Sequence, residues 1–157
     1  MKILAVSDSH SIKSSLLEAV ELESPELILH LGDHNTDCAA IEGEYPEITL
    51  RSVRGNCDRF SPGPEMDEFT LDGKKFFITH GHLFGVKSGL SSIINYSISC
   101  RADIVLFGHT HIPHYSVREN LTLINPGSIT FGEKTYAILD FKNGIVSCEI
   151  KSLNNIP

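Results

Sequence analysis

Short apolar runs alternate with polar segments along the whole chain and predict ten strands and three helices. Most of the runs are rich in Val, Ile, Leu and Phe and are bounded by Gly, Pro, Asn or Asp, which is typical of strands. The predicted strands are 2–7, 26–31, 48–53, 66–71, 74–79, 103–107, 114–118, 121–124, 135–141 and 145–150. Helical spacing and helix-start residues predict helices over 12–22, 36–44 and 88–100.

The order of these elements predicts the fold class. Strands and helices alternate through the first two thirds of the chain, which favours parallel strands, whereas the last third is almost entirely strand. Asp72-Gly73 and Asn143-Gly144 each separate two strand-like runs and predict two-residue hairpin turns, because both turn positions need a positive φ. We therefore expect an α/β protein with layered sheets, the second antiparallel or mixed, and helices on the outside.

Length and composition restrict the function classes. A chain of 157 residues, 41% of them hydrophobic, is expected to form a single domain over 1–157. No apolar run approaches the roughly 18 residues of a membrane span, and no signal-peptide pattern follows Met1, so we expect a soluble cytoplasmic protein. A net charge of −7 without clustered Lys and Arg argues against nucleic-acid and anionic-membrane partners.

Residues able to bind a metal follow directly after five of the apolar runs. These segments are Asp8-Ser9-His10, Gly32-Asp33, Gly55-Asn56-Cys57-Asp58, His80-Gly81-His82 and Gly108-His109-Thr110-His111. Ligands of open α/β sheets bind beyond the carboxyl ends of the strands, so the five segments are expected to converge. Side chains alternate along an extended chain, so each Asp-x-His or His-x-His pair is expected to project to one side. A Gly-Asp pair alone is more often a turn or a helix cap, and an Asp-x-His pair is common by chance, whereas His-x-His at a strand end is more telling. The five motifs together predict a metal site.

These motifs, in this order, resemble those of the calcineurin-like metallophosphoesterases. The Gly55-Asn56-Cys57-Asp58 variant, with Asn125-Pro126-Gly127-Ser128 further on, resembles the small YfcE-like phosphodiesterase group of that superfamily. The resemblance implies a four-layer αββα sandwich of two mixed β-sheets flanked by helices, with two divalent metal ions at the strand ends.

The resemblance also implies the ligands and the reaction. One ion would be held by Asp8, His10, Asp33 and His111, and the other by Asp33, Asn56, His80 and His109. Family analogy favours Mn²⁺, and the donor set also suits Ni²⁺, Fe²⁺ or Zn²⁺. A metal-bridging hydroxide is then expected to hydrolyse a small phosphodiester, with Asp33 and Asn56 as catalytic ligands.

Three further residues affect the expected chemistry. Many relatives carry a histidine where this chain has Cys57, and a thiol donates protons poorly, so His82 becomes the candidate for proton delivery. Arg54 and Arg59 flank Asn56 and are candidate substrate contacts, although an arginine beside a loop is more often a solvated surface charge. Esters with acidic leaving groups are therefore expected to be the better substrates.

A different class of function stays open. Vps29 has a related fold and serves as a protein-binding scaffold, which would require an exposed apolar patch here, for example from Ile112, Pro113, Tyr115 or Leu121. The complete set of seven candidate ligands favours catalysis. A homo-oligomer is compatible with the sequence.

Overall fold

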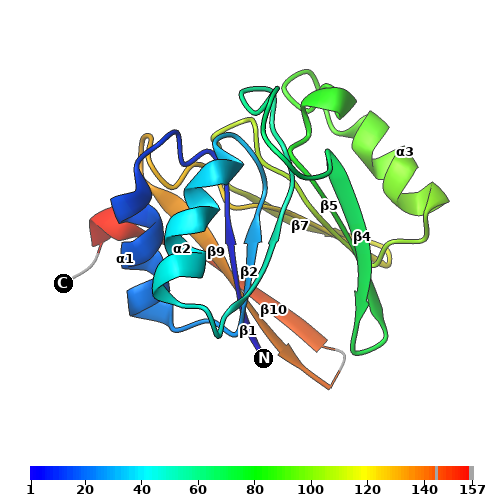
Figure 1. Ribbon diagram of the computed structural model, residues 1–157. Helices are drawn as coiled ribbons and strands as arrows, with labels where there is room; N and C mark the ends of the chain where they lie inside the picture. Colours follow the sequence, from blue (N-terminus) through cyan, green and yellow to red (C-terminus); the bar gives the residue numbers. More distant parts are fainter. Residues whose placement is uncertain (144, 156–157) are drawn as a thin grey trace.

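The computed structural model describes residues 1–143 and 145–155, which form two five-stranded sheets packed face to face (Figure 1). The strands are β1 (Lys2–Val6), β2 (Leu27–His30), β3 (Thr49–Ser52), β4 (Met66–Leu71), β5 (Lys74–Thr79), β6 (Ile104–Leu106), β7 (His114–Arg118), β8 (Leu121–Asn125), β9 (Thr135–Lys142) and β10 (Ile145–Ser152). The helices are α1 (Lys13–Glu23), α2 (Cys38–Glu44) and α3 (Ser91–Ser99), with short 3₁₀ turns η1 (Asn35–Asp37), η2 (His82–Phe84) and η3 (Leu153–Asn155). All predicted strands and helices are confirmed, with ends that differ by a few residues.

Both sheets are mixed. The first has the order β10-β9-β1-β2-β3, in which β1, β2 and β3 are parallel, β9 is antiparallel to β1, and β10 is antiparallel to β9. The second has the order β4-β5-β6-β8-β7, with β5, β6 and β8 parallel and an antiparallel strand at each edge. The predicted turn at Asp72-Gly73 has positive φ at both positions. Asn143 also has a positive φ, whereas Gly144 lies outside the described residues.

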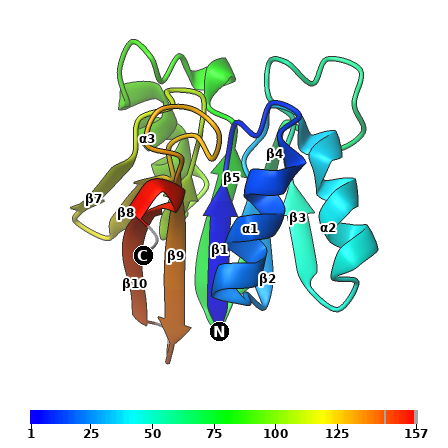
Figure 2. The same ribbon diagram turned by 90° about the vertical axis from the view of Figure 1, so that its left-hand side faces the viewer.

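Alternation along β1 shows how the layers are held together. Ile3 and Ala5 face the second sheet and belong to the core between the sheets, while Leu4 and Val6 face the helices. Helix α1 packs on that outer face, as Figure 2 shows from the α1 side, and α3 covers the outer face of the second sheet. The expected αββα sandwich is confirmed. Among the described residues, no helix is long and apolar enough to cross a membrane.

The two sheets bring five strand ends to one edge of the sandwich. Strands β1, β2 and β3 end there from the first sheet, and β5 and β6 end there from the second. Backbone hydrogen bonds join the segments that follow these strands. The Asp8 N–H donates to the Gly32 carbonyl at 3.0 Å, and the Gly108 N–H donates to the His80 carbonyl at 3.1 Å. The five motif segments therefore converge as expected, from two sheets.

Candidate metal centre

Asp8 is the fully buried carboxylate at the middle of this edge. It follows β1 in the left-handed backbone region, with φ at 58°. Its Oδ2 atom accepts a hydrogen bond from the Ser7 hydroxyl at 2.6 Å and a second from the His109 backbone N–H at 3.2 Å. Two donors thus fix one carboxylate oxygen and leave Oδ1 directed at other groups.

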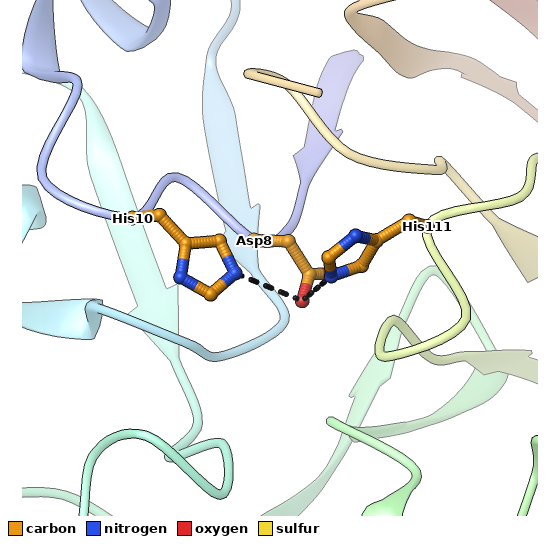
Figure 3. A group of neighbouring side chains, drawn as sticks. All are labelled: Asp8, His10 and His111. Atoms are coloured by element: carbon orange, nitrogen blue, oxygen red, sulfur yellow. Dashed lines mark hydrogen bonds and ion pairs between the residues drawn. The ribbon is translucent and has the colours of Figure 1, made fainter. Parts of the chain in front are cut away.

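Three imidazoles surround the Oδ1 atom of Asp8. Figure 3 shows His10 and His111 on either side of the carboxylate, and His80 approaches from β5. The three Nε2 atoms lie 3.1 Å (His111), 3.8 Å (His10) and 3.9 Å (His80) from Oδ1. One carboxylate oxygen and three ring nitrogens from different segments therefore meet at one point.

Asp33 connects this group to a second one. Its Oδ2 atom lies 3.7 Å from His10 Nε2, and its Oδ1 atom lies 3.5 Å from His80 Nε2. The Cys57 N–H donates to Oδ1 at 2.9 Å and holds the carboxylate in this orientation. The two oxygens of Asp33 thus face different imidazoles.

The tautomer of His80 leaves a nitrogen lone pair facing these carboxylates. His80 Nδ1 lies 2.7 Å from the Leu31 carbonyl, which can only accept, so Nδ1 carries the hydrogen. In the neutral ring Nε2 is then a bare acceptor opposite the oxygens of Asp8 and Asp33. His80 Nε2 and His10 Nε2 are buried and have no hydrogen-bond partner among the described residues. A lone pair beside anionic oxygens is favourable only with a cation between them, so these residues fit a metal ion.

The pKa shifts of Asp33 and His80 follow from the same geometry. Burial alone would raise the pKa of Asp33, but the nearby charge of His80 and the hydrogen bond from the Cys57 N–H outweigh it and lower that pKa well below its ordinary value. Burial alone would lower the pKa of His80, but Asp33 and Asp8 outweigh it and raise that pKa. A divalent cation would take the place of the proton that these carboxylates attract.

Glycines allow the backbone to approach both carboxylates closely. A Cβ atom at Gly55 would lie 2.1 Å from Asp33 Oδ1, and one at Gly108 would lie 3.0 Å from Asp8 Oδ2. Any side chain at these positions would fill the space beside the carboxylates.

Three groups of neighbouring ligand atoms result. In each group the atoms lie within 4.8 Å of one another; the groups are Asp8, His10 and His111; Asp8, Asp33 and His80; and His10, Asp33 and Cys57. Five of the seven predicted ligands thus share one site.

The other two predicted ligands lie beside it. The His109 ring centroid is 5.0 Å from that of His80, and burial and the charge of His80 lower the pKa of His109 to about 4. Asn56 is exposed, and its amide nitrogen donates to Cys57 Sγ at 3.4 Å.

The expectation that both members of the His-x-His motif project to one side is wrong, whereas Asp8 and His10 do share a ligand group. Asp8, His10, His109 and His111 all have positive φ between 43° and 68°, so neither motif is extended and side-chain alternation does not apply. The ring of His111 lies against His10, whereas the ring of His109 lies against His80. The two members of the His-x-His motif therefore face different ligand groups.

The remaining candidate residues surround the site. The His82 ring lies 5.4 Å from that of His80, and burial and the charge of His80 lower its pKa. Arg54 is partly buried with its Nη2 atom 3.6 Å from Glu65 Oε1, whereas Arg59 is exposed and lies over the Phe60 ring.

Several residues that sequence reasoning missed hold the site in place. Ser9 donates to Asp37 at 2.8 Å and accepts from His30 Nε2 at 3.1 Å. The ring hydrogen of His30 lies on Nε2 because Nδ1 accepts from the Gly32 N–H. Ser9 is the residue between the two ligands of its motif, and nothing in its local sequence marks this long-range role.

Phe131 was also missed. Its ring stacks on His111 with a centroid distance of 5.5 Å and meets the edge of His10 at 5.2 Å. Its N–H donates to Ser128 Oγ at 3.0 Å, and Ser128 in turn donates to the Asp8 carbonyl. The sequence signal for this role of Phe131 was its position three residues after Ser128, which is the last residue of the motif 125–128.

The residues proposed for a protein-binding patch separate in the structure. Leu121 is buried under α3, whereas Ile112, Pro113 and Tyr115 are exposed.

Comparison with known proteins identifies relatives that span most of this chain. Residues 1–144 match the family model described as the calcineurin-like phosphoesterase superfamily domain. The chain is 34% identical over 152 residues to the probable metallophosphoesterase YsnB of Bacillus subtilis, covering 91% of this chain and 86% of the relative. It is 28% identical over 168 residues to the phosphodiesterase YfcE of Escherichia coli K12, covering 89% of this chain and 88% of the relative.

Solved structures show the same fold. A predicted phosphoesterase from Streptococcus pneumoniae TIGR4 superposes with a TM-score of 0.81 at 27% identity, over 96% of this chain and 88% of the other. A Vps29 variant from Entamoeba histolytica gives a TM-score of 0.76 over 98% of this chain and all of the other. Its 19% identity shows the shared fold alone. The family match and the 34% identity to YsnB together establish that this chain belongs to the calcineurin-like phosphoesterase superfamily.

Proposed function

We propose that the protein hydrolyses small phosphodiesters at a dinuclear metal centre. One ion would be held by Asp8, His10, Asp33 and His111, and the other by Asp33, Asn56, His80 and His109. The observation that carries this proposal is the meeting of three Nε2 atoms at Asp8 Oδ1, two of them buried without a hydrogen-bond partner among the described residues. Nitrogen lone pairs and carboxylates gathered in this way are the donor set of a divalent transition metal.

Asp33 is suited to the shared position. Its Oδ2 atom faces His10 and its Oδ1 atom faces His80, so one carboxylate reaches both ligand groups. The Cys57 N–H fixes the carboxylate, and the Leu31 carbonyl fixes the His80 ring, so neither ligand has to reorient on binding.

The chemistry that two divalent ions supply at such a site is the activation of water for attack on phosphorus and the neutralisation of phosphate charge. The chain contributes two buried carboxylates against this positive charge. The site then attracts an anionic ester although the whole chain carries a net charge of −7. Mn²⁺ is the proposed metal, and a single cytoplasmic domain over 1–157 is part of the same proposal.

Proton delivery to the leaving group is the weak step of this centre. The Cys57 thiol donates weakly, and burial together with Asp33 raises its pKa to about 11. His82 lies beside His80, and burial lowers its pKa, which favours the neutral ring. We therefore propose aryl phosphodiesters, whose leaving groups need no proton, as better substrates than alkyl phosphodiesters. Arg54 and Arg59 are the proposed contacts of the substrate phosphate.

The test combines metal analysis with hydrolysis of a bis-aryl phosphodiester. Hydrolysis should disappear on chelation, return with Mn²⁺, and be lost in Asp33→Ala but retained in Asp140→Ala, which removes an exposed carboxylate of β9. Activity that survives chelation, or that persists in Asp33→Ala, would contradict the proposal. A scaffold of the Vps29 type predicts no chelator-sensitive hydrolysis, so the same assay distinguishes the two functions.

A further inference from the structure

Cys57 lies at the rim of the candidate centre in a well-defined position. Its N–H donates to Asp33 Oδ1 at 2.9 Å, and its Sγ accepts from the Asn56 amide at 3.4 Å. The next residue, Asp58, is buried and accepts from the backbone N–H groups of Asn35 and Gly55, at 3.1 Å and 2.8 Å. These bonds tie the loop that carries the thiol to the loop that follows β2.

The sulfur completes a ligand group of its own. Single donor atoms of His10, Asp33 and Cys57 lie within 4.8 Å of one another. His10 Nε2 is buried without a hydrogen-bond partner among the described residues and lies 3.7 Å from Asp33 Oδ2. Nitrogen and sulfur ligands of one tetrahedral ion lie about 3.5 Å apart, given metal–nitrogen and metal–sulfur bonds of about 2.0 and 2.3 Å. The three donors, within 4.8 Å of one another, approach that spacing, and the Cys57 side chain is exposed.

We propose that His10, Asp33 and Cys57 form a thiolate-containing subsite that binds a thiophilic divalent cation, of which Cd²⁺ and Zn²⁺ are examples. The inference rests on the proposed function, because His10 and Asp33 are also proposed ligands of the dinuclear centre. Thiolate prefers softer ions, whereas imidazole, carboxylate and amide oxygen suit Mn²⁺ without sulfur. On binding, the thiol proton leaves to solvent and the sulfur lone pair forms the bond to the cation.

The subsite gives the chain two ways to hold a cation. Without a soft ion the oxygen and nitrogen ligands alone serve Mn²⁺. A soft ion recruits Cys57 in addition and thereby occupies His10 and Asp33, which the dinuclear centre also needs. We expect Cd²⁺ to bind more tightly than Mn²⁺ and to inhibit hydrolysis.

Cobalt absorption and cadmium titration test the subsite directly. With Co²⁺ bound, the wild-type chain should show near-ultraviolet thiolate-to-cobalt charge-transfer absorption, which Cys57→Ser should lack. Cys148→Ser removes a partly buried thiol of β10 and should keep the absorption. In calorimetric titration Cys57→Ser should lose at least tenfold in Cd²⁺ affinity and less than twofold in Mn²⁺ affinity.

Three results would overturn the subsite: no charge-transfer absorption in the wild-type chain, absorption that persists in Cys57→Ser, or unchanged Cd²⁺ affinity in that variant. Matching circular dichroism spectra of the three proteins exclude unfolding as the cause of a lost band. Hydrolysis with Mn²⁺ but no cobalt band would refute the subsite alone. A Cys57-dependent band without hydrolysis in any metal would refute the proposed function and leave the subsite in place.

Discussion

Replacing Gly108 by alanine tests how closely the backbone must approach Asp8. A Cβ atom at this position would lie 1.9 Å from Ser7 Oγ and 3.0 Å from Asp8 Oδ2. The Ser7 hydroxyl donates to that same carboxylate oxygen at 2.6 Å, so it has to move and give up the hydrogen bond. Gly108 does not have a positive φ, so the effect is steric and owes nothing to backbone strain.

The expected cost follows from these two contacts. Losing a hydrogen bond to a charged group costs about 1.5–3 kcal/mol, and overpacking a filled site costs about 1–3 kcal/mol. Gly108→Ala should therefore lower the free energy of unfolding by about 2.5–6 kcal/mol, and Ser7→Ala by about 1.5–3 kcal/mol. In the double variant the hydrogen bond is lost only once, so the combined cost should fall short of additivity by about 1.5–3 kcal/mol.

Equilibrium urea unfolding in the presence of a chelator measures these values without a contribution from bound metal. Gly43→Ala is the matched control, because a Cβ there meets nothing within 4 Å and the residue lies in α2. That change should stabilise the chain by about 0.5–1 kcal/mol. The reasoning is refuted if Gly108→Ala behaves like Gly43→Ala, or if the Ser7 and Gly108 changes are additive within about 0.5 kcal/mol.

Three other predictions concern residues around the site and on the opposite face. Burial lowers the pKa of His30 from 6.5 to about 4, so between these values the unfolded chain binds a proton that the folded chain excludes. The free energy of unfolding should fall by about 3 kcal/mol as the pH falls through that window. An equally steep pH dependence of the unfolding free energy in His30→Gln, measured by urea unfolding, would contradict this. Burial alone would raise the pKa of Glu23, but Lys151 and Tyr136 outweigh it, so the pKa lies below 4.5 and the stabilisation is lost as pH falls through the lowered value. Glu23→Gln should cost about 1–3 kcal/mol near neutral pH and less in acid, and an unchanged acid unfolding profile would argue against it. Phe131→Ala removes two ring contacts worth about 0.5–1.5 kcal/mol each and should weaken Mn²⁺ binding by calorimetry roughly 5-fold to 100-fold. Phe60→Ala, which removes a side chain that is 94% exposed, should leave Mn²⁺ affinity unchanged. Equal Mn²⁺ affinities in the two variants would refute the role of Phe131.

The strands were predictable because local apolar patterns determine them. The predicted bounds of β4, β5 and β7 agree with the structure at both ends. Of the five strands that lead into the motifs, β1, β2, β3 and β6 end one residue earlier than predicted, and positive φ follows soon after β1 and β6, at Asp8 and His109. An apolar run marks the strand but does not reveal where the backbone turns into positive φ.

The start of α2 shows how long-range contacts override local signals. The predicted helix over 36–44 begins with the 3₁₀ turn η1, and the α-helix proper starts at Cys38. Asp37 does not cap this helix, because its carboxylate accepts from the Ser9 hydroxyl and the Ser11 N–H across the site. Local sequence spacing does not predict hydrogen-bond partners that lie more than twenty residues away along the chain.

The composition of the site was predictable, but its arrangement was not. Topology alone brings five strand ends together, so the residue types that follow them indicated a metal centre. Which imidazole faces which carboxylate depends on left-handed backbone at positions such as His109 and His111, where alternation fails. Phe131 reaches the site from a segment whose local sequence has no metal-binding character.

Anomalous diffraction from crystals soaked in Mn²⁺ tests most directly whether these side chains hold metal. We expect two manganese peaks within bonding distance of Asp33, one that also contacts Asp8, His10 and His111 and another that contacts Asn56, His80 and His109. The absence of manganese at Asp33, or a single peak elsewhere on the chain, would contradict a dinuclear centre at this edge of the sandwich.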